Sequence, residues 1–257
     1  MNKIFDSFTL KMIAIVGMIL QHTAMILEEF IPFALEVPMH LAGGLTFPIM
    51  AFFLIEGYKH TSNVKSYIGR LLIFAVLSQV PYLFAYQVPT LIYPLNIMFI
   101  LSLGLIMIHL HEVMTSRGLF WFLFVIFLLL SFTMEWGLIG LVMILMYKTI
   151  KNEKSRRFWP PTMAAIINVV LGLIGMGSVA LLDLMGNVPE LAAYTQLDFD
   201  ISVQSFSLVV FFGLGSLIAA LLLPQYNGKR GRNMQYFFYV IYPLHFFILG
   251  MIVSFLT

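Results

Sequence analysis

The 257-residue chain is 61% hydrophobic and only 10% charged, and it contains 25 phenylalanines and 17 methionines. A soluble domain carries about 25% charged residues, so this composition excludes a soluble globular fold and predicts an all-α, polytopic integral membrane protein. The absence of cysteine excludes disulfides and thiol catalysis. The net charge of +2 says little by itself, whereas the positions of the charges along the chain carry information.

A helix that crosses a bilayer core needs about 20 apolar residues. We expect nine transmembrane helices in one domain over residues 1–257, and the first stretch is expected to be retained because it lacks the cleavage site of a signal peptide. The nine stretches cover about residues 8–28, 38–58, 67–86, 92–110, 118–132, 135–149, 161–183, 205–223 and 234–256.

The fifth and sixth stretches form one apolar block from Arg117 to Lys148 that only the sequence TMEWG interrupts. The block is too long for one helix and short for two. We predict two short helices that turn at Glu135.

With nine spans, all 14 basic residues lie on one face of the membrane. The positive-inside rule then puts the N-terminus in the cytoplasm and the C-terminus outside, in a plasma or inner membrane. Merging the fifth and sixth spans would scatter the later basic loops over both faces, which favours nine. The longest outer loop, about residues 184–204, is acidic.

Polar side chains interrupt the first span. His22 lies past its midpoint, beside Gln21, and Lys11 lies about three turns earlier on the same face. A lone histidine in a membrane helix can simply be hydrogen-bonded to a neighbouring helix. It can also be a general base, because histidine changes its charge near neutral pH.

The next spans carry further candidates. Glu56 and His60 are one helical turn apart, where a solvated pair at a helix end is the simpler interpretation. Arg70 can either reach lipid phosphates or hold an anionic ligand. Asn96 begins the fourth span and can cap it.

The last span contains Tyr242 and His245 one turn apart. A tyrosine stripe that ends at a histidine in the membrane suggests the lining of a polar cavity, although such stripes also serve packing. His109 and His111 are two residues apart and would point away from each other on a helix, so we expect no metal site.

Four segments of the chain resemble the TraX family: LKMIAIVGMILQHTAMI, FPIMAFFLIEGYKHTSNVKSYIGRLLIFAVLSQVPY, LNIMFILSLGLI and QYFFYVIYPLHFFIL. The second segment is the most specific. That family is named for a conjugative-pilus protein that acetylates the pilin N-terminus, and it is similar to broader transmembrane acyltransferases that use cytoplasmic acyl-CoA.

The resemblance implies a site. His22 takes the place of the family's first-helix histidine, and Glu56, Arg70, Asn96 and His245 fall in the matching segments. Gln21 stands where we expect aspartate, and it cannot balance an imidazolium. Glu28, Glu29 or a carboxylate from another helix would then have to balance the charge of the imidazolium.

The resemblance therefore implies an integral membrane acyltransferase that uses acetyl-CoA or a close acyl-CoA as co-substrate and no metal. His22 would be the base or transient acyl carrier, supported by Gln21, Glu56, Tyr242 and His245. The acyl-CoA would be bound by basic residues with Asn96: Lys11, Arg70, Arg156, Arg157 and Arg230. The acceptor is an amine or hydroxyl outside, on a pilin-like peptide, a glycan or a lipid.

Two other classes remain open. A transporter or lipid flippase would use the same polar cavity as a passage. An assembly factor would need no chemistry. In each case the partners include membrane lipids and no nucleic acid.

Overall fold

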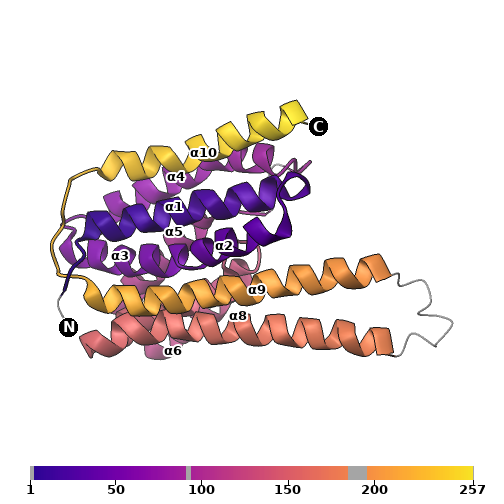
Figure 1. Ribbon diagram of the computed structural model, residues 1–257. Helices are drawn as coiled ribbons and strands as arrows, with labels where there is room; N and C mark the ends of the chain where they lie inside the picture. The colour runs from indigo at the N-terminus through magenta and orange to yellow at the C-terminus, as the bar shows by residue number, and fades with distance from the viewer. Residues whose placement is uncertain (1–2, 91–93, 185–195, 257) are drawn as a thin grey trace.

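The computed structural model describes residues 3–90, 94–184 and 196–256, which form an all-α bundle (Figure 1). Within these ranges the chain has no β-strand, only two isolated bridges. The α-helices are α1 (Ser7–Ile26), α2 (Phe33–Gly44), α3 (Thr46–His60), α4 (Val64–Ala85), α5 (Ile97–Val113), α6 (Arg117–Ser131), α7 (Gly137–Thr149), α8 (Glu153–Leu184), α9 (Gln196–Leu222) and α10 (Gln235–Leu256).

Among the described residues, six helical segments are long and apolar enough to cross a membrane: α1, α2 with α3, α4, α8, α9 and α10. Helices α5, α6 and α7 are apolar but shorter, at 17, 15 and 13 residues. The structure thus confirms an all-α protein with several helices that are candidates for spanning a membrane, while the count of nine and the orientation of the termini remain predictions. Figure 1 shows the two termini at opposite ends of the bundle, as an odd number of crossings requires.

The second predicted span is two helices, α2 and α3, which meet at Leu45. Pro48 has no N–H to donate to the carbonyl four residues earlier, so the carbonyl oxygen of Gly44 loses its helical partner. The hydroxyl of Ser216 in α9 donates to this oxygen at 2.8 Å. The proline therefore causes the break, and a neighbouring helix satisfies the freed backbone group.

The turn predicted at Glu135 is confirmed, because α6 ends at Ser131 and α7 begins at Gly137. Backbone hydrogen bonds attach this turn to Leu95: its N–H donates to Thr133 at 2.9 Å, and its carbonyl accepts from Glu135 at 3.0 Å. The α6–α7 turn is thereby fixed beside the start of α5.

Helices α8 and α9 extend further than the predicted spans, by eight and nine residues at their N-terminal ends. The spans counted only apolar residues, whereas a helix continues into polar flanks as long as its backbone bonds are satisfied. Residues 196–204, predicted as loop, thus belong to α9, and residues 185–195 of that loop lie outside the described ranges. In Figure 1 the α8–α9 pair projects beyond the other helices at the end where the chain terminates.

The packing of the helices brings distant segments together. Helix α8 lies along α9, α2 lies between α1 and α9, and α10 lies on α4 (Figure 1). Helices α2 and α9 approach each other closely because Gly44 and Gly215 have no Cβ. A Cβ at either position would overlap a backbone carbonyl of the other helix. Helix α1 contacts α2, α3 and α10.

Candidate functional site

A cavity of about 340 Å³ lies at the end of α1 that carries His22. We call it the histidine cavity. Its walls come from α1, α2, α3, α5, the α6–α7 turn, α7, α8 and α9. The lining residues are Met18, Gln21, His22, Met25, Gly43, Thr46, Ile97, Glu135, Trp136, Ile139, Asn168 and Phe212.

His22 is paired with His245 of α10. The two imidazoles are nearly parallel, with an interplanar angle of 11°, and His22 Nδ1 lies 2.8 Å from His245 Nε2. Both side chains are buried, at 6% and 4% exposure. Both histidines were predicted from the sequence to belong to one site, and the structure brings them into contact across 223 residues of chain.

The backbone fixes the proton positions in this pair. His245 Nδ1 lies 3.0 Å from the carbonyl oxygen of Ile241, which can only accept, so Nδ1 carries the proton. In the neutral ring Nε2 is then the acceptor, and His22 must donate from its own Nδ1. This leaves the lone pair of a neutral His22 on Nε2, the nitrogen that a general base or nucleophile uses.

Glu135 is an ionisable residue of this cavity that was not predicted from the sequence to belong to the site. Its carboxylate accepts the backbone N–H of Ile97 at 2.8 Å and hydrogen bonds from the hydroxyls of Tyr82 and Tyr242. It therefore binds the N-terminus of α5, where the helix dipole favours negative charge. An acidic residue inside the apolar block TMEWG was the available signal, but it was interpreted only as a turn.

The α6–α7 turn that carries Glu135 is strained. Trp136 adopts φ 65°, the left-handed region that bulky residues rarely occupy, and its ring stacks on Phe47 with centroids 4.6 Å apart. Such strain concentrates at functional sites and needs surrounding contacts to hold it. Here the strained turn is the segment that places both Glu135 and Trp136 in the cavity wall.

Of the other predicted supporting residues, Gln21 and Tyr242 belong to this site, whereas Glu56 does not. Gln21 lines the cavity, because Gly43 opposite has no Cβ to displace its side chain. Tyr242 is buried, and its hydroxyl oxygen also accepts the Ile97 N–H at 3.3 Å. Glu56 is not in this group, since it lies near the other end of α3.

A second cavity, of about 600 Å³, lies at the opposite end of α1. We call it the cationic cavity. Of the residues predicted to bind acyl-CoA, Lys11, Arg70 and Arg230 line it together, and the wall also contains His60, Arg232 and Glu56. The structure thus gathers three of the six predicted binding residues from α1, α4 and the α9–α10 linker.

The cations of this cavity have no acidic partner in the described part of the chain. Arg70 donates to the hydroxyl of Ser66 at 2.9 Å, and Arg230 donates to the side chain of Asn233 at 2.7 Å. Lys11 Nζ lies over the rings of Phe53 and Phe238, 5.0 and 5.4 Å from their centroids. This arrangement provides uncompensated positive charge on a partly aromatic wall, which suits a phosphate-bearing ligand.

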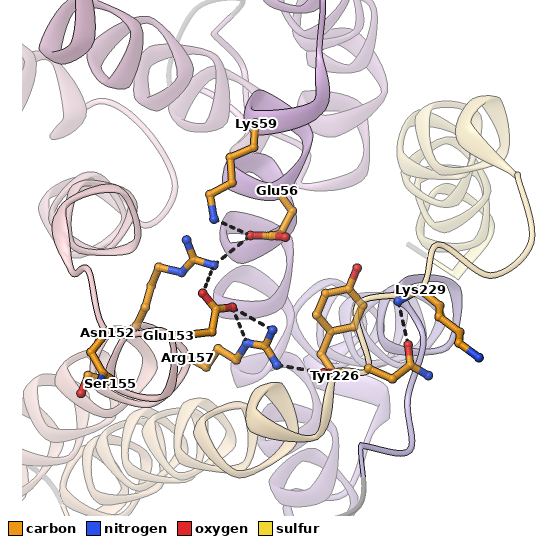
Figure 2. A network of polar contacts seen from close by, with 10 residues as sticks. Glu56, Lys59, Asn152, Glu153, Ser155, Arg157, Tyr226 and Lys229 are labelled. Carbon is orange, nitrogen blue, oxygen red and sulfur yellow. Dashed lines mark hydrogen bonds and ion pairs between the residues drawn. The ribbon is translucent and has the colours of Figure 1, made fainter.

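Arg156 and Arg157 do not line either cavity. Figure 2 shows Arg157 in a network of ion pairs and hydrogen bonds that joins α3, α8 and the α9–α10 linker, and Arg156 belongs to the same network. Arg156 binds Glu56 at 3.1 Å, and Arg157 binds Glu153 at 2.8 Å and the carbonyl oxygen of Tyr226 at 2.8 Å. Both guanidinium groups are buried and paired with acceptors of the protein, although Arg156 Nε itself has no hydrogen-bond partner among the described residues. The geometry therefore favours a structural role over ligand binding.

Asn96 also lies outside both cavities. It caps α5 by accepting the N–H of Met98 at 3.0 Å, and its amide donates to Ala75 and Gln79 at 2.8 Å each. The side chain is completely buried. Asn96 is therefore a helix cap, as the second interpretation of its position in the sequence suggested, and it also binds α4.

The model of the family described as TraX protein matches residues 7–253. A curated relative, the probable fimbrial assembly protein FimC, serogroup H1, of Dichelobacter nodosus, is 26% identical over 255 residues, covering 95% of this chain and 94% of the relative. No solved structure matches. Because the match extends over nearly the whole chain, this protein belongs to the TraX family.

Proposed function

We propose that this protein is an integral membrane acyltransferase that moves an acetyl or other short acyl group from cytoplasmic acyl-CoA to an acceptor across the membrane. In this proposal the chain crosses the membrane nine times, with the N-terminus inside and the C-terminus outside. The cationic cavity then opens toward the cytoplasm, and the histidine cavity opens toward the outside.

One observation carries the proposal: α1 joins two cavities of complementary chemistry. Lys11, in the cationic cavity, precedes His22 by 11 residues, a rise of about 16 Å along the helix. A ligand whose phosphates bind near Lys11 and whose reactive end is carried on a long flexible arm would bridge this distance. Acyl-CoA has this shape and charge.

The proposed step uses the lone pair of His22 Nε2. The acceptor N–H or O–H gives its proton to Nε2 as its nitrogen or oxygen forms a bond to the thioester carbonyl carbon. The carbon–sulfur bond then breaks, and the proton passes from His22 to the sulfur of the leaving thiolate. The products are the acylated acceptor and free CoA, so protons and electrons balance without another reactant.

The surrounding groups support this role. His245 holds the His22 ring and its tautomer through the 2.8 Å hydrogen bond. Glu135 supplies a carboxylate in the same cavity, where it would stabilise the imidazolium that forms during transfer. Glu135 would thereby take over the role of the aspartate that is expected at position 21, where this chain has Gln21.

For the acceptor, the name of the curated relative refers to fimbrial assembly. We therefore propose a pilin-like peptide as the first acceptor to test, with glycans and lipids as the other outcomes of the same assay.

Acyl-CoA binding is tested by thermal denaturation of the detergent-purified protein. Acetyl-CoA at 100 times its Kd should stabilise the protein by about 2.7 kcal/mol. Lys11→Gln and Arg230→Gln should weaken this effect, whereas Lys154→Gln, an exposed control outside both cavities, should leave it unchanged. No stabilisation at millimolar acetyl-CoA would contradict the proposal and favour the transporter hypothesis.

A further inference from the structure

The two cavities are separated by a thin wall. On α3, Thr46 lines the histidine cavity and Met50 lines the cationic cavity, one helical turn or about 6 Å further along. On α5, the adjacent residues Ile97 and Met98 line the histidine and cationic cavities, respectively. The wall is therefore one turn thick on one helix and one residue thick on the other.

The frame of this wall is held by hydrogen bonds. Thr46 donates to the carbonyl oxygen of Ala14 at 2.9 Å, which fixes α3 to α1 at this level. The start of α5 is fixed by its cap Asn96 and by Glu135, as described above. The helices on both sides of the wall are consequently anchored, so an opening has to come from side chains.

Two of the side chains on the cationic side of the wall are methionines. Met98 is buried at 7% exposure, and Met50 is half-buried. Methionine is unbranched, has three rotatable bonds, and can change its shape without moving the backbone. A wall of this kind can close the cavities off from each other and still let a narrow chain pass.

We infer that Met50 and Met98 form a movable partition through which the thioester end of the acyl-CoA passes from the cationic cavity to His22. This inference rests on the proposed function for the identity of the ligand, but the partition itself does not depend on it. When Met50 and Met98 close around the bound arm, they keep cytoplasmic water away from the thioester, which limits its hydrolysis.

Cysteine labelling tests the partition, because the chain has no native cysteine. Thr46→Cys places a thiol on the histidine side, and a membrane-impermeant methanethiosulfonate reagent is added to sealed vesicles only at the face that carries Lys11. Met98→Ala in this background should increase the labelling rate by about tenfold, equivalent to a barrier lower by about 1.4 kcal/mol. Gln21→Cys, deeper in the same cavity, gives a second position if Thr46→Cys folds poorly.

The matched control is Met107→Ala. It removes the same side chain from the same helix, at a fully buried position outside both cavities. Labelling that is equally fast in the Met98→Ala and Met107→Ala proteins would overturn the partition, as would a Met98→Ala protein that labels no faster than its parent.

Coenzyme A separates the partition from the proposed function. CoA added at the same face should slow the labelling of the Met98→Ala protein, because the ligand would occupy the passage. Faster labelling that CoA does not slow would support the partition and contradict acyl-CoA as its ligand. In a transfer assay, Met98→Ala should also release more free CoA per acylated acceptor than Met107→Ala.

Discussion

Replacing Asn96 by alanine tests whether this residue supports the fold or binds the ligand. The side chain is completely buried and makes three hydrogen bonds, to Met98, Ala75 and Gln79. Loss of the helix cap costs about 1 kcal/mol, and each of the other two bonds contributes about 1 kcal/mol net. The total is about 3 kcal/mol, which corresponds to a fall in Tm of about 6–12 °C for a protein of this size.

The assay is thermal denaturation of the purified protein with and without acetyl-CoA. Asn63→Ala is a matched control, because Asn63 caps α4 from an exposed position with one bond, to the N–H of Ser66 at 2.9 Å. It should lower Tm by only about 2–4 °C. An Asn96→Ala protein with an unchanged Tm that is no longer stabilised by acetyl-CoA would refute this reasoning and return Asn96 to the ligand site.

Three further predictions concern the site, the packing and the topology. His245→Phe should retain acetyl-CoA binding and lower the transfer rate by about 10²-fold, because His22 loses its acceptor; a near wild-type rate would exclude a positioning role. Gly17→Ala should lower Tm by several degrees, because the new Cβ would overlap the backbone carbonyl of Ala42 in α2. Gly69→Ala, with open space around it, should leave Tm unchanged, and equal effects of the two substitutions would contradict the packing of α1 on α2. In intact cells, Lys154→Cys should resist impermeant thiol reagents and Glu29→Cys should react, and the opposite pattern would reverse the orientation.

The sequence was sufficient to predict what depends on local pattern. The apolar run at residues 8–28 became α1, Ser7–Ile26, and the turn at Glu135 follows from an acidic residue in an apolar block. Membership of the TraX family likewise followed from local segments. These features depend on neighbours within one or two helical turns, which a single sequence contains.

The sequence could not reveal which polar groups satisfy one another over long distances. Arg157 was predicted to bind acyl-CoA, yet its guanidinium binds Glu153 and the backbone carbonyl of Tyr226, which is 69 residues away. Glu135 was interpreted only as a turn residue, because nothing local shows that its carboxylate accepts the backbone N–H of Ile97 at the start of α5. In both cases the deciding partner is set by tertiary packing, so charge and spacing alone were ambiguous.

The central claim is that His22 is the base of an acyl transfer. The most direct measurement follows isotope-labelled acetyl from acetyl-CoA to a pilin-like peptide, a glycan or a lipid, with purified protein in vesicles. We expect that His22→Gln folds, is stabilised by acetyl-CoA like the wild type, and transfers acetyl about 10²–10⁴-fold more slowly. A folded His22→Gln protein that transfers acetyl at nearly the wild-type rate would contradict it.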